Sequence, residues 1–472
     1  MATASQSEFG GKVGDRTAGG VSRTGLPALR LLGFISPALP IGAVGLPLTI
    51  YLPVYYSGYV GLSLALVGFA FFIVRTVDIG FDPIMGWIVD RTRTPWGQCR
   101  PWMVFGSAVI VGSTLMLFLA PKGTGVAYLV VGLSLLYAGT SIVGVAQPAW
   151  AARLAPGYNE RSHIYAWMQV ASSAGTFLLL ALPMARAIIG PTEPGSEVHS
   201  MGVALAATLP VAVVLALLSL PEPKVPAAHD GADDRVRLRD YILLLRRGSV
   251  RRLVLADLFA NLGTATSSTL FLFFWRAARG YTDAQSNLII IIYFLAALLS
   301  VPFWVRLCRL IGKHKAFILS GMGYVLVMPA MAFIPRGHIE IVVPAMGLVG
   351  LTYAASAFLI RSMAADAADE ARLDTGVDRL GQIYAMLAST SKVGAAVAVG
   401  IAFGVLQAAG FHPASGAHNA PSSLHVLELI YVGAPALMTF MGLMAIVGYG
   451  LDHEAHDRVR LALAERDRKA AG

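Results

Sequence analysis

Long apolar runs recur along this chain, and they constrain its fold more than any other feature. Windows of about 19 residues find runs close to the roughly 20 residues that a membrane-spanning helix needs. Only 13% of the residues are charged and 56% are hydrophobic, too little polar material for a water-facing surface. We predict an all-α membrane protein with twelve spans, at 31–54, 62–85, 102–121, 126–150, 164–187, 201–220, 253–275, 288–307, 316–333, 341–360, 380–408 and 426–449.

Basic residues alternate from loop to loop. The net charge of +9 therefore does not form one patch for nucleic acid, and it indicates topology instead. By the positive-inside rule we expect both termini to be cytoplasmic, in a membrane of the bacterial inner-membrane type. The loops that carry the basic residues precede the first span (Arg16, Arg23, Arg30) and follow the second (Arg91, Arg93, Arg100), fourth (Arg153, Arg161) and eighth (Arg306, Arg309, Lys313, Lys315).

The longest polar segment divides the spans into two equal sets. We expect a disordered cytoplasmic tail at 1–27, a six-helix bundle at 28–220, a cytoplasmic loop at 221–252, a second six-helix bundle at 253–450 and a cytoplasmic tail at 451–472. The segment 82–87 at the end of span two is echoed by 301–304 at the end of span eight. Two parallel six-helix repeats are the layout of the major facilitator fold. Pro37, Pro40, Pro47 and Pro53 in span one predict a helix that bends or opens locally.

An acidic pair lies inside span two. A carboxylate near the bilayer centre costs at least about 2.5 kcal/mol, which makes it a functional candidate. The spacing of Asp78 and Asp82 predicts two side chains on one helical face, roughly 6 Å apart, with Arg75 on the same stripe. These three residues carry a net charge of minus one, which a single Na⁺ or H⁺ would neutralise. The alternative is a structural ion cluster that ties helices together.

The loop after span two carries a second charged motif. Gly86, Asp90, Arg91 and Arg93 fit the Gly-x-x-x-Asp-Arg-x-Arg signature of major facilitator proteins. The glycine would permit a close helix approach, and the aspartate could pair with arginines in a conformational gate. A solvated charged loop is the alternative.

The whole stretch 75–102 resembles the glycoside–pentoside–hexuronide:cation symporters, the relatives of melibiose permease. Further matching segments lie at 159–161, 302–315, 365–369 and 391–392. The resemblance implies uptake of a sugar or glycoside driven by Na⁺ or H⁺, with Asp78 and Asp82 as cation ligands. It also places Lys392 near the cation and sugar sites, where Asp78 or Asp82 would be its counter-charge; a snorkelling lysine is the alternative.

The sugar-binding half of the family pattern is not reproduced. Gly42, Ala146 and Met168 stand where melibiose permease holds its sugar with two aspartates and an arginine, and Arg153 replaces a common glutamate. Sugars are bound by hydrogen bonds and aromatic plates, so other polar and aromatic residues become the substrate candidates, although each could be a packing residue. They are Gln147, Trp150, Trp167, Gln169, Asn261, Gln382 and Tyr384.

These features predict a secondary active transporter and not an enzyme. The chain has no Gly-x-x-x-x-Gly-Lys motif, which disfavours ATP-driven pumping. We expect a monomer in membrane lipid that binds a small-molecule substrate and a coupling ion, Na⁺ or H⁺, with no other cofactor. Two alternatives remain: a transporter of a non-sugar substrate such as a lysolipid, drug or organic acid, and a sensor that no longer transports.

Overall fold

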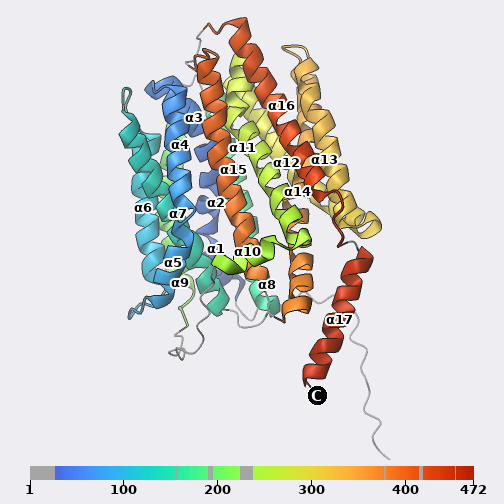
Figure 1. The fold of residues 1–472 in the computed structure, drawn as a ribbon. Coiled ribbons are helices and arrows are strands. Elements are labelled where there is room, and N and C mark those ends of the chain that lie inside the picture. Colours follow the sequence, from blue (N-terminus) through green and yellow to red (C-terminus); the bar gives the residue numbers. More distant parts are fainter. Residues whose placement is uncertain are drawn as a thin grey trace, which may run out of the picture.

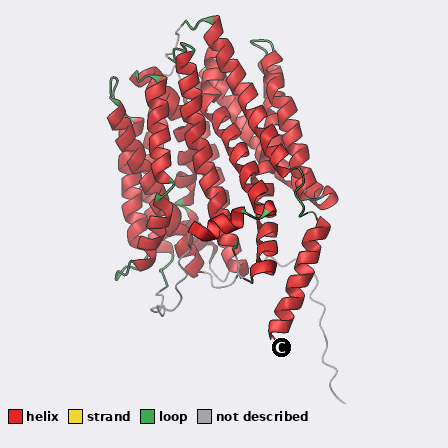
Figure 2. Cartoon of the chain, viewed as in Figure 1, coloured by secondary structure: helices red, strands yellow, loops and turns green. Residues whose placement is uncertain are grey.

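The computed structural model describes residues 27–154, 158–189, 195–223, 238–376, 379–413, 418–451 and 453–471. Within them the chain is built of helices joined by loops (Figure 2), and the only extended pairing is an isolated bridge between Thr94 and Gly97. The predicted all-helical fold is therefore confirmed for the described residues. The helices are α1 Ala28–Ile35, α2 Ala38–Leu46, η1 Pro47–Tyr51, α3 Leu52–Val54, η2 Tyr55–Val60, α4 Leu64–Asp78, α5 Phe81–Arg91, α6 Arg100–Phe118, α7 Val126–Leu154, α8 Tyr158–Ile189, α9 Ser196–Ser219, α10 Leu238–Leu245, α11 Gly248–Phe273, η3 Phe274–Ala278, α12 Asp283–Ile311, α13 Lys313–Ala330, η4 Met331–Phe333, α14 Ile339–Thr375, α15 Leu380–Ala408, α16 Pro421–Ile446 and α17 His453–Ala471.

Ten helices in the described part of the chain are long and apolar enough to cross a membrane. They confirm a multi-pass membrane protein. The expected second and seventh spans are not among them, because α4 and α5 are separated at 79–80 and are only 15 and 11 residues long, while α11 is rich in Ser, Thr and Asn and holds Asp257. The exact count of twelve stays a prediction that depends on these two polar segments.

The proline-rich first span is interrupted as predicted. It runs as α1, α2, a π-helical turn that begins at Pro47, the short α3 that contains Pro53, and a second π-helical turn that ends at Val60. Proline cannot donate the regular helical hydrogen bond, so the ladder shifts register at these points. The loosened segment lies against α8, α9 and α11.

Helices from the first part of the chain lie on one side of the molecule and those from the last part on the other (Figure 1). On the first side α6 packs on α7 and α9, and on the second α11 packs on α15 and α16. The two sides meet where α4 runs along α15. Small residues permit this contact, since Gly68 faces Phe403 and Gly400 faces Phe72. This helix pair positions the charged site described below.

Two segments that were expected to be a loop and a tail contain helices. The predicted loop 221–252 contains α10, and α11 begins inside it at Gly248. The predicted tail 451–472 contains α17, which lies beyond the main group of helices in Figure 1 and contacts α14. Arg466 on α17 donates to the carbonyl oxygens of Arg372 and Leu373 at 2.9 and 3.2 Å.

Candidate cation and substrate site

Asp78 and Asp82 lie on either side of the break between α4 and α5. Asp78 is the last residue of α4, and Asp82 lies in the first turn of α5. A carboxylate is stabilised near a helix N-terminus and destabilised near a C-terminus. Asp82 therefore gains from its own helix, whereas Asp78 requires cationic partners.

Lys392 on α15 supplies the first of these partners. Its ammonium nitrogen lies 2.9 Å from Asp78 Oδ2 and 2.8 Å from Asp82 Oδ2, and it donates to the Asp78 carbonyl oxygen at 3.0 Å. The Asp78 side chain is 4% exposed and the Asp82 side chain 40%. The predicted counter-charge is thus present, and a single ammonium group bridges both carboxylates.

Arg75 and two residues of α7 complete the cluster. Arg75 donates to Asp78 Oδ2 at 3.3 Å, and its guanidinium lies 4.2 Å from the centre of the Tyr137 ring. Ser141 donates to Asp78 Oδ1 at 3.2 Å. Counting Lys392, the cluster holds two positive and two negative charges. The excess negative charge expected from Arg75, Asp78 and Asp82 alone is therefore cancelled in this conformation.

A cavity of about 350 Å³ opens beside the cluster. This volume falls in the range of small-molecule sites. Its lining combines the four charged residues with hydroxyl groups and with glycines that leave room on the wall: Ile41, Val44, Gly45, Leu48, Arg75, Asp78, Asp82, Tyr137, Thr140, Ser141, Gly144, Val145 and Lys392.

Carboxylate and hydroxyl oxygens are suitable ligands for a hard cation such as Na⁺. Among the described residues no group of three or more His, Cys, Asp or Glu side chains converges on one point. A cation in this cavity would rest on two carboxylates and neutral oxygens, which suits a monovalent ion better than a divalent one.

The altered sugar-site positions are occupied by packing. An added Cβ at Gly42 would lie 2.0 Å from Ser172 Oγ and 2.6 Å from Ser172 Cα on α8. Ala146 is fully buried in the core, and Met168 packs against that core. Even a Cβ atom clashes at position 42, so an acidic side chain cannot stand there while α2 and α8 pack this closely.

We expect Gly42→Ala to destabilise the fold by about 1–3 kcal/mol, the usual effect of overpacking. The clash involves Ser172 backbone, which cannot move aside as a side-chain tip can. Gly45→Ala is the matched control, because a Cβ there meets no atom within 4 Å. Thermal unfolding in detergent should show a lower midpoint for the first variant only; equal midpoints would contradict the close α2–α8 contact.

None of the predicted substrate residues lines the cavity beside the charged cluster, and Asn261 lines a smaller, separate one. Trp150 is fully buried edge-on against Phe34, and Gln147 donates to the Phe34 carbonyl at 3.3 Å. This packing against α1 makes Trp150 unsuitable as a sugar plate in this conformation. Two others lie on α8, where Trp167 donates to His163 and Gln169 is exposed. Two more lie on α15, where Gln382 accepts a hydrogen bond from Arg379 and Tyr384 donates to the Arg361 carbonyl oxygen.

The loop motif after α5 is only partly described. An added Cβ at Gly86 would meet no atom within 4 Å, so the expected close helix approach is absent in this conformation. Arg91 stacks over Trp87 with its guanidinium 4.1 Å from the ring centre, and Arg93 is exposed. The side chain of Asp90 lies outside the described residues.

Arg153, the base found where an acid was expected, has a structural partner. It forms an ion pair with Glu222 at 2.7 Å. Glu222 also accepts from the backbone N–H groups of Gln98, Cys99 and Arg100 at the start of α6, where a carboxylate is favoured. Arg153 therefore helps to hold the segment after α9 against the α5–α6 loop.

Three cavity residues were missed from the sequence. Tyr137, Thr140 and Ser141 all point from α7 toward the charged cluster or its cavity. Their spacing of three and four residues puts them on one helical face. This polar stripe in the expected fourth span could have predicted the cavity wall from the sequence.

A family model described as MFS/sugar transport protein matches residues 33–453. The chain belongs to this family. It is a membrane transporter of the major facilitator fold and not an enzyme, as predicted. The match also confirms the resemblance to the glycoside–cation symporters.

Named relatives of this MFS/sugar transport protein agree with the assignment. The isoprimeverose transporter of Lactiplantibacillus pentosus is 24% identical over 417 residues, which cover 85% of this chain and 84% of the relative. The uncharacterized symporter YnaJ of Bacillus subtilis strain 168 is 22% identical over 450 residues, covering 93% and 95%. A crystal structure of a mutant nucleoside transporter, NupG, superposes with a TM-score of 0.68 at 11% identity, covering 88% of this chain and 99% of that one.

The two parts of this MFS/sugar transport protein are joined where α9 and α12 begin and α11 ends. Arg276 pairs with Glu197 at 2.9 Å, and Asn287 donates to Glu197 at 3.5 Å. The Tyr51 hydroxyl donates to Asn287 Oδ1 at 2.7 Å, with both residues 1% exposed. We call these four residues, Tyr51, Glu197, Arg276 and Asn287, the Glu197 cluster. It links the first and last parts of the chain near the first turns of α9 and α12.

We expect the Arg276→Ala variant to populate conformations that are open at this end about 5-fold more than the wild type does. A partly exposed ion pair contributes at most about 1 kcal/mol, which corresponds to this change in the equilibrium constant. A cysteine placed at Ile50, which lies just inside the cluster, should react faster with a membrane-impermeant maleimide in the variant. Arg276→Lys, which keeps a positive charge beside both Glu197 and Asp283, should retain the slow rate. An unchanged rate in Arg276→Ala would mean that the cluster does not hold this end closed.

Proposed function

We propose that this transporter is a symporter that couples the entry of Na⁺ or H⁺ to the uptake of a sugar or glycoside. One observation carries the proposal: Lys392 Nζ lies between Asp78 and Asp82 on the wall of a cavity of substrate size. A tethered ammonium in this position marks where a free cation would be stabilised.

Coupling follows from competition at the two carboxylates. An incoming monovalent cation can bind to Asp78 and Asp82 only as the Lys392 ammonium withdraws, because the cluster is neutral with Lys392 in place. The released ammonium needs a new acceptor in a medium of low dielectric. A hydroxyl-rich substrate in the adjoining cavity can supply one. Cation and substrate would then favour each other by linkage.

The cavity chemistry supports a hydroxylated substrate. Tyr137, Thr140 and Ser141 present hydroxyl groups, and Gly45 and Gly144 add no side chain to the lining. Sugar sites combine such hydrogen-bonding groups with aromatic surfaces. The family description and the isoprimeverose transporter among the relatives favour the same class.

Transport would proceed by alternating access, with the bundles at 28–220 and 253–450 rocking about the cavity. The Glu197 cluster supports this, because it joins the two parts at one end while the cavity lies between α2, α4, α7 and α15. We place the protein in a bacterial-type inner membrane with both termini cytoplasmic, from the alternation of basic loops.

A substrate panel tests the proposal. Vesicles that contain the transporter should take up at least one labelled monosaccharide or glycoside faster with Na⁺ or an inward proton gradient than without. Uptake of a lysolipid or an organic acid alone would replace the sugar proposal. Binding without counterflow of any panel member would indicate a sensor.

A further inference from the structure

A second carboxylate lies inside the membrane part of the chain, away from the cation pair. Asp257 is on α11, about 14 Å along the helix from its first residue, Gly248. Thr390 on α15 donates a hydrogen bond to Asp257 Oδ2, and the side chain of Asn261 donates to the main-chain carbonyl oxygen of Asp257 at 2.8 Å. The ion pairs of Asp78 and Asp82 do not involve Asp257.

Polar side chains of four helices surround a small cavity at Asp257. Its volume is about 60 Å³, and its polar lining is Asp257, Asn261, Thr264, Tyr324, Tyr353, Ser356 and Thr439. This space has room for water and enough polar partners to hold it. It is far smaller than the roughly 300 Å³ of the smallest ligand sites. A proton or a water molecule can reach Asp257 here, but a sugar cannot.

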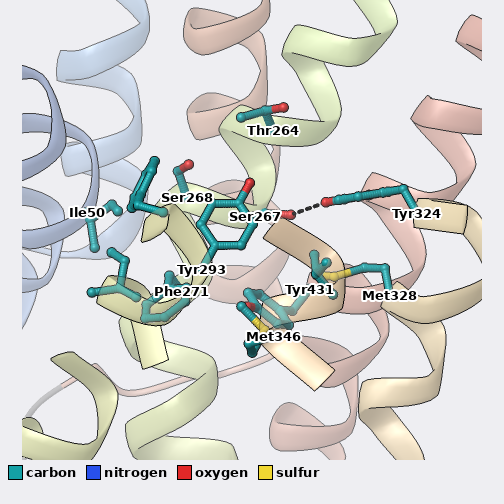
Figure 3. A pocket seen from close by; sticks show the side chains of 13 residues that line it. Ile50, Thr264, Ser267, Ser268, Phe271, Tyr293, Tyr324, Met328, Met346 and Tyr431 are labelled. Carbon is teal, nitrogen blue, oxygen red and sulfur yellow. Dashed lines mark hydrogen bonds between the residues drawn. The ribbon is translucent and has the colours of Figure 1, made fainter. Parts of the chain in front are cut away.

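A second cavity adjoins the first toward the far end of α11, and its lining is largely apolar, with Phe271, Met328 and Met346 among the residues. It shares Thr264 and Tyr324 with the first, and its volume is about 30 Å³. Figure 3 shows the Ser267 hydroxyl bonded to the Tyr324 hydroxyl across it, at 3.3 Å, with Tyr293 and Ser268 nearby. Hydroxyl groups therefore line both spaces in succession.

The charge environment of Asp257 differs from that of Asp78. No Lys, Arg or His nitrogen of the described residues lies within ion-pair distance of its carboxylate, whereas Asp78 has two such partners. The groups that face it are Arg361 and Tyr353 from α14, Tyr324 from α13, Thr390 from α15 and Thr439 from α16. Only Arg361 among them is charged, and it acts from beyond direct contact.

A membrane-embedded carboxylate without an ion pair is costly and is relieved by taking up a proton. We propose that Asp257 is a proton-binding site, separate from the Asp78 and Asp82 pair. The proton comes from the aqueous phase as hydronium and passes to a carboxylate oxygen, which leaves a neutral water molecule in the cavity and converts the Asp257 side chain to a neutral acid. Thr390, which bonds to this oxygen, lies two residues before Lys392 on α15, so protonation at Asp257 alters a contact of the helix that holds the cation site. This consequence for transport rests on the proposed symport function.

Infrared difference spectroscopy of the purified full-length transporter tests the site without any substrate. The wild type should show the C=O absorption of a protonated carboxylic acid that disappears as the pH rises. Asp257→Asn should lack this absorption, because asparagine imitates the neutral acid and cannot titrate. The matched control Asp374→Asn, which removes an exposed carboxylate paired with Arg247, should keep it. A signal that persists in Asp257→Asn, or is missing from the wild type at every pH, overturns the proposal.

Thr390→Val gives a second test if Asp257→Asn does not fold. Thr390 donates to the charged form of Asp257, so its loss favours the neutral acid. The midpoint of the infrared signal should move to higher pH, by roughly one unit. An unchanged midpoint would contradict the assignment of the signal to Asp257. Uptake by the wild type in liposomes keeps the two proposals apart: uptake that only equalises the internal and external substrate concentrations refutes the symport function and leaves the infrared result standing.

Discussion

Asp82→Asn should abolish cation-driven accumulation of substrate while exchange of substrate across the membrane continues. The change removes one of the two carboxylates that bind Lys392 Nζ and leaves Arg75 and Lys392 against Asp78 alone. This cluster would carry a net positive charge and repel a further cation. The accumulation ratio in vesicles should fall to about one, a loss of the whole coupling free energy, which is about 1–3 kcal/mol in typical linked systems.

Glu340→Gln is a suitable control for this experiment. Glu340 is an exposed carboxylate paired with His338 at one end of α14, and it lies outside the cavity. The Glu340→Gln variant should accumulate substrate as the wild type does. Accumulation at the wild-type level in Asp82→Asn would instead show that Asp78 and Asp82 form a structural ion cluster.

Lys392→Gln should have the opposite effect on cation binding. Removal of the ammonium leaves Arg75, Asp78 and Asp82 with a net negative charge, so a free cation no longer competes with a tethered one. We expect the apparent affinity for the coupling cation to rise about 10-fold, which corresponds to about 1.4 kcal/mol. Net transport should slow, because the bound cation then has no internal competitor to release it.

The cation dependence of substrate binding measures this change directly. Lys313→Gln serves as the control, since Lys313 is the first residue of α13 and pairs with Asp366 at 2.7 Å, away from the cavity. A fall in cation affinity in Lys392→Gln would mean that Lys392 supports the bound cation and does not compete with it.

Sequence patterns predicted the elements of this fold well, because a lipid environment demands long apolar helices and penalises buried charge. The same penalty identified Asp78 and Asp82 as a candidate site. The same search for charged residues inside apolar spans could also have identified Asp257, which lies in the expected seventh span. It was missed because Asp257 is a single acid in a span that also holds Asn, Ser and Thr side chains, so it does not stand out as the paired acids of span two do.

The substrate residues could not be predicted in this way. Whether a tryptophan such as Trp150 faces a cavity or a neighbouring helix depends on tertiary packing, and here it packs against Phe34. The contact of Gly42 with Ser172 on α8 is likewise invisible in the sequence. The position of Lys392 between both carboxylates depends on how α15 meets α4, a contact between residues more than 300 positions apart.

Uptake by purified transporter in liposomes under an imposed ion gradient tests the central claim most directly. With a substrate identified from the panel, an inward gradient of Na⁺ or H⁺ should drive the internal concentration above the external one, and an ionophore that collapses that gradient should abolish the excess. Uptake that only equalises the two concentrations, and that responds to neither gradient, would contradict cation-coupled symport.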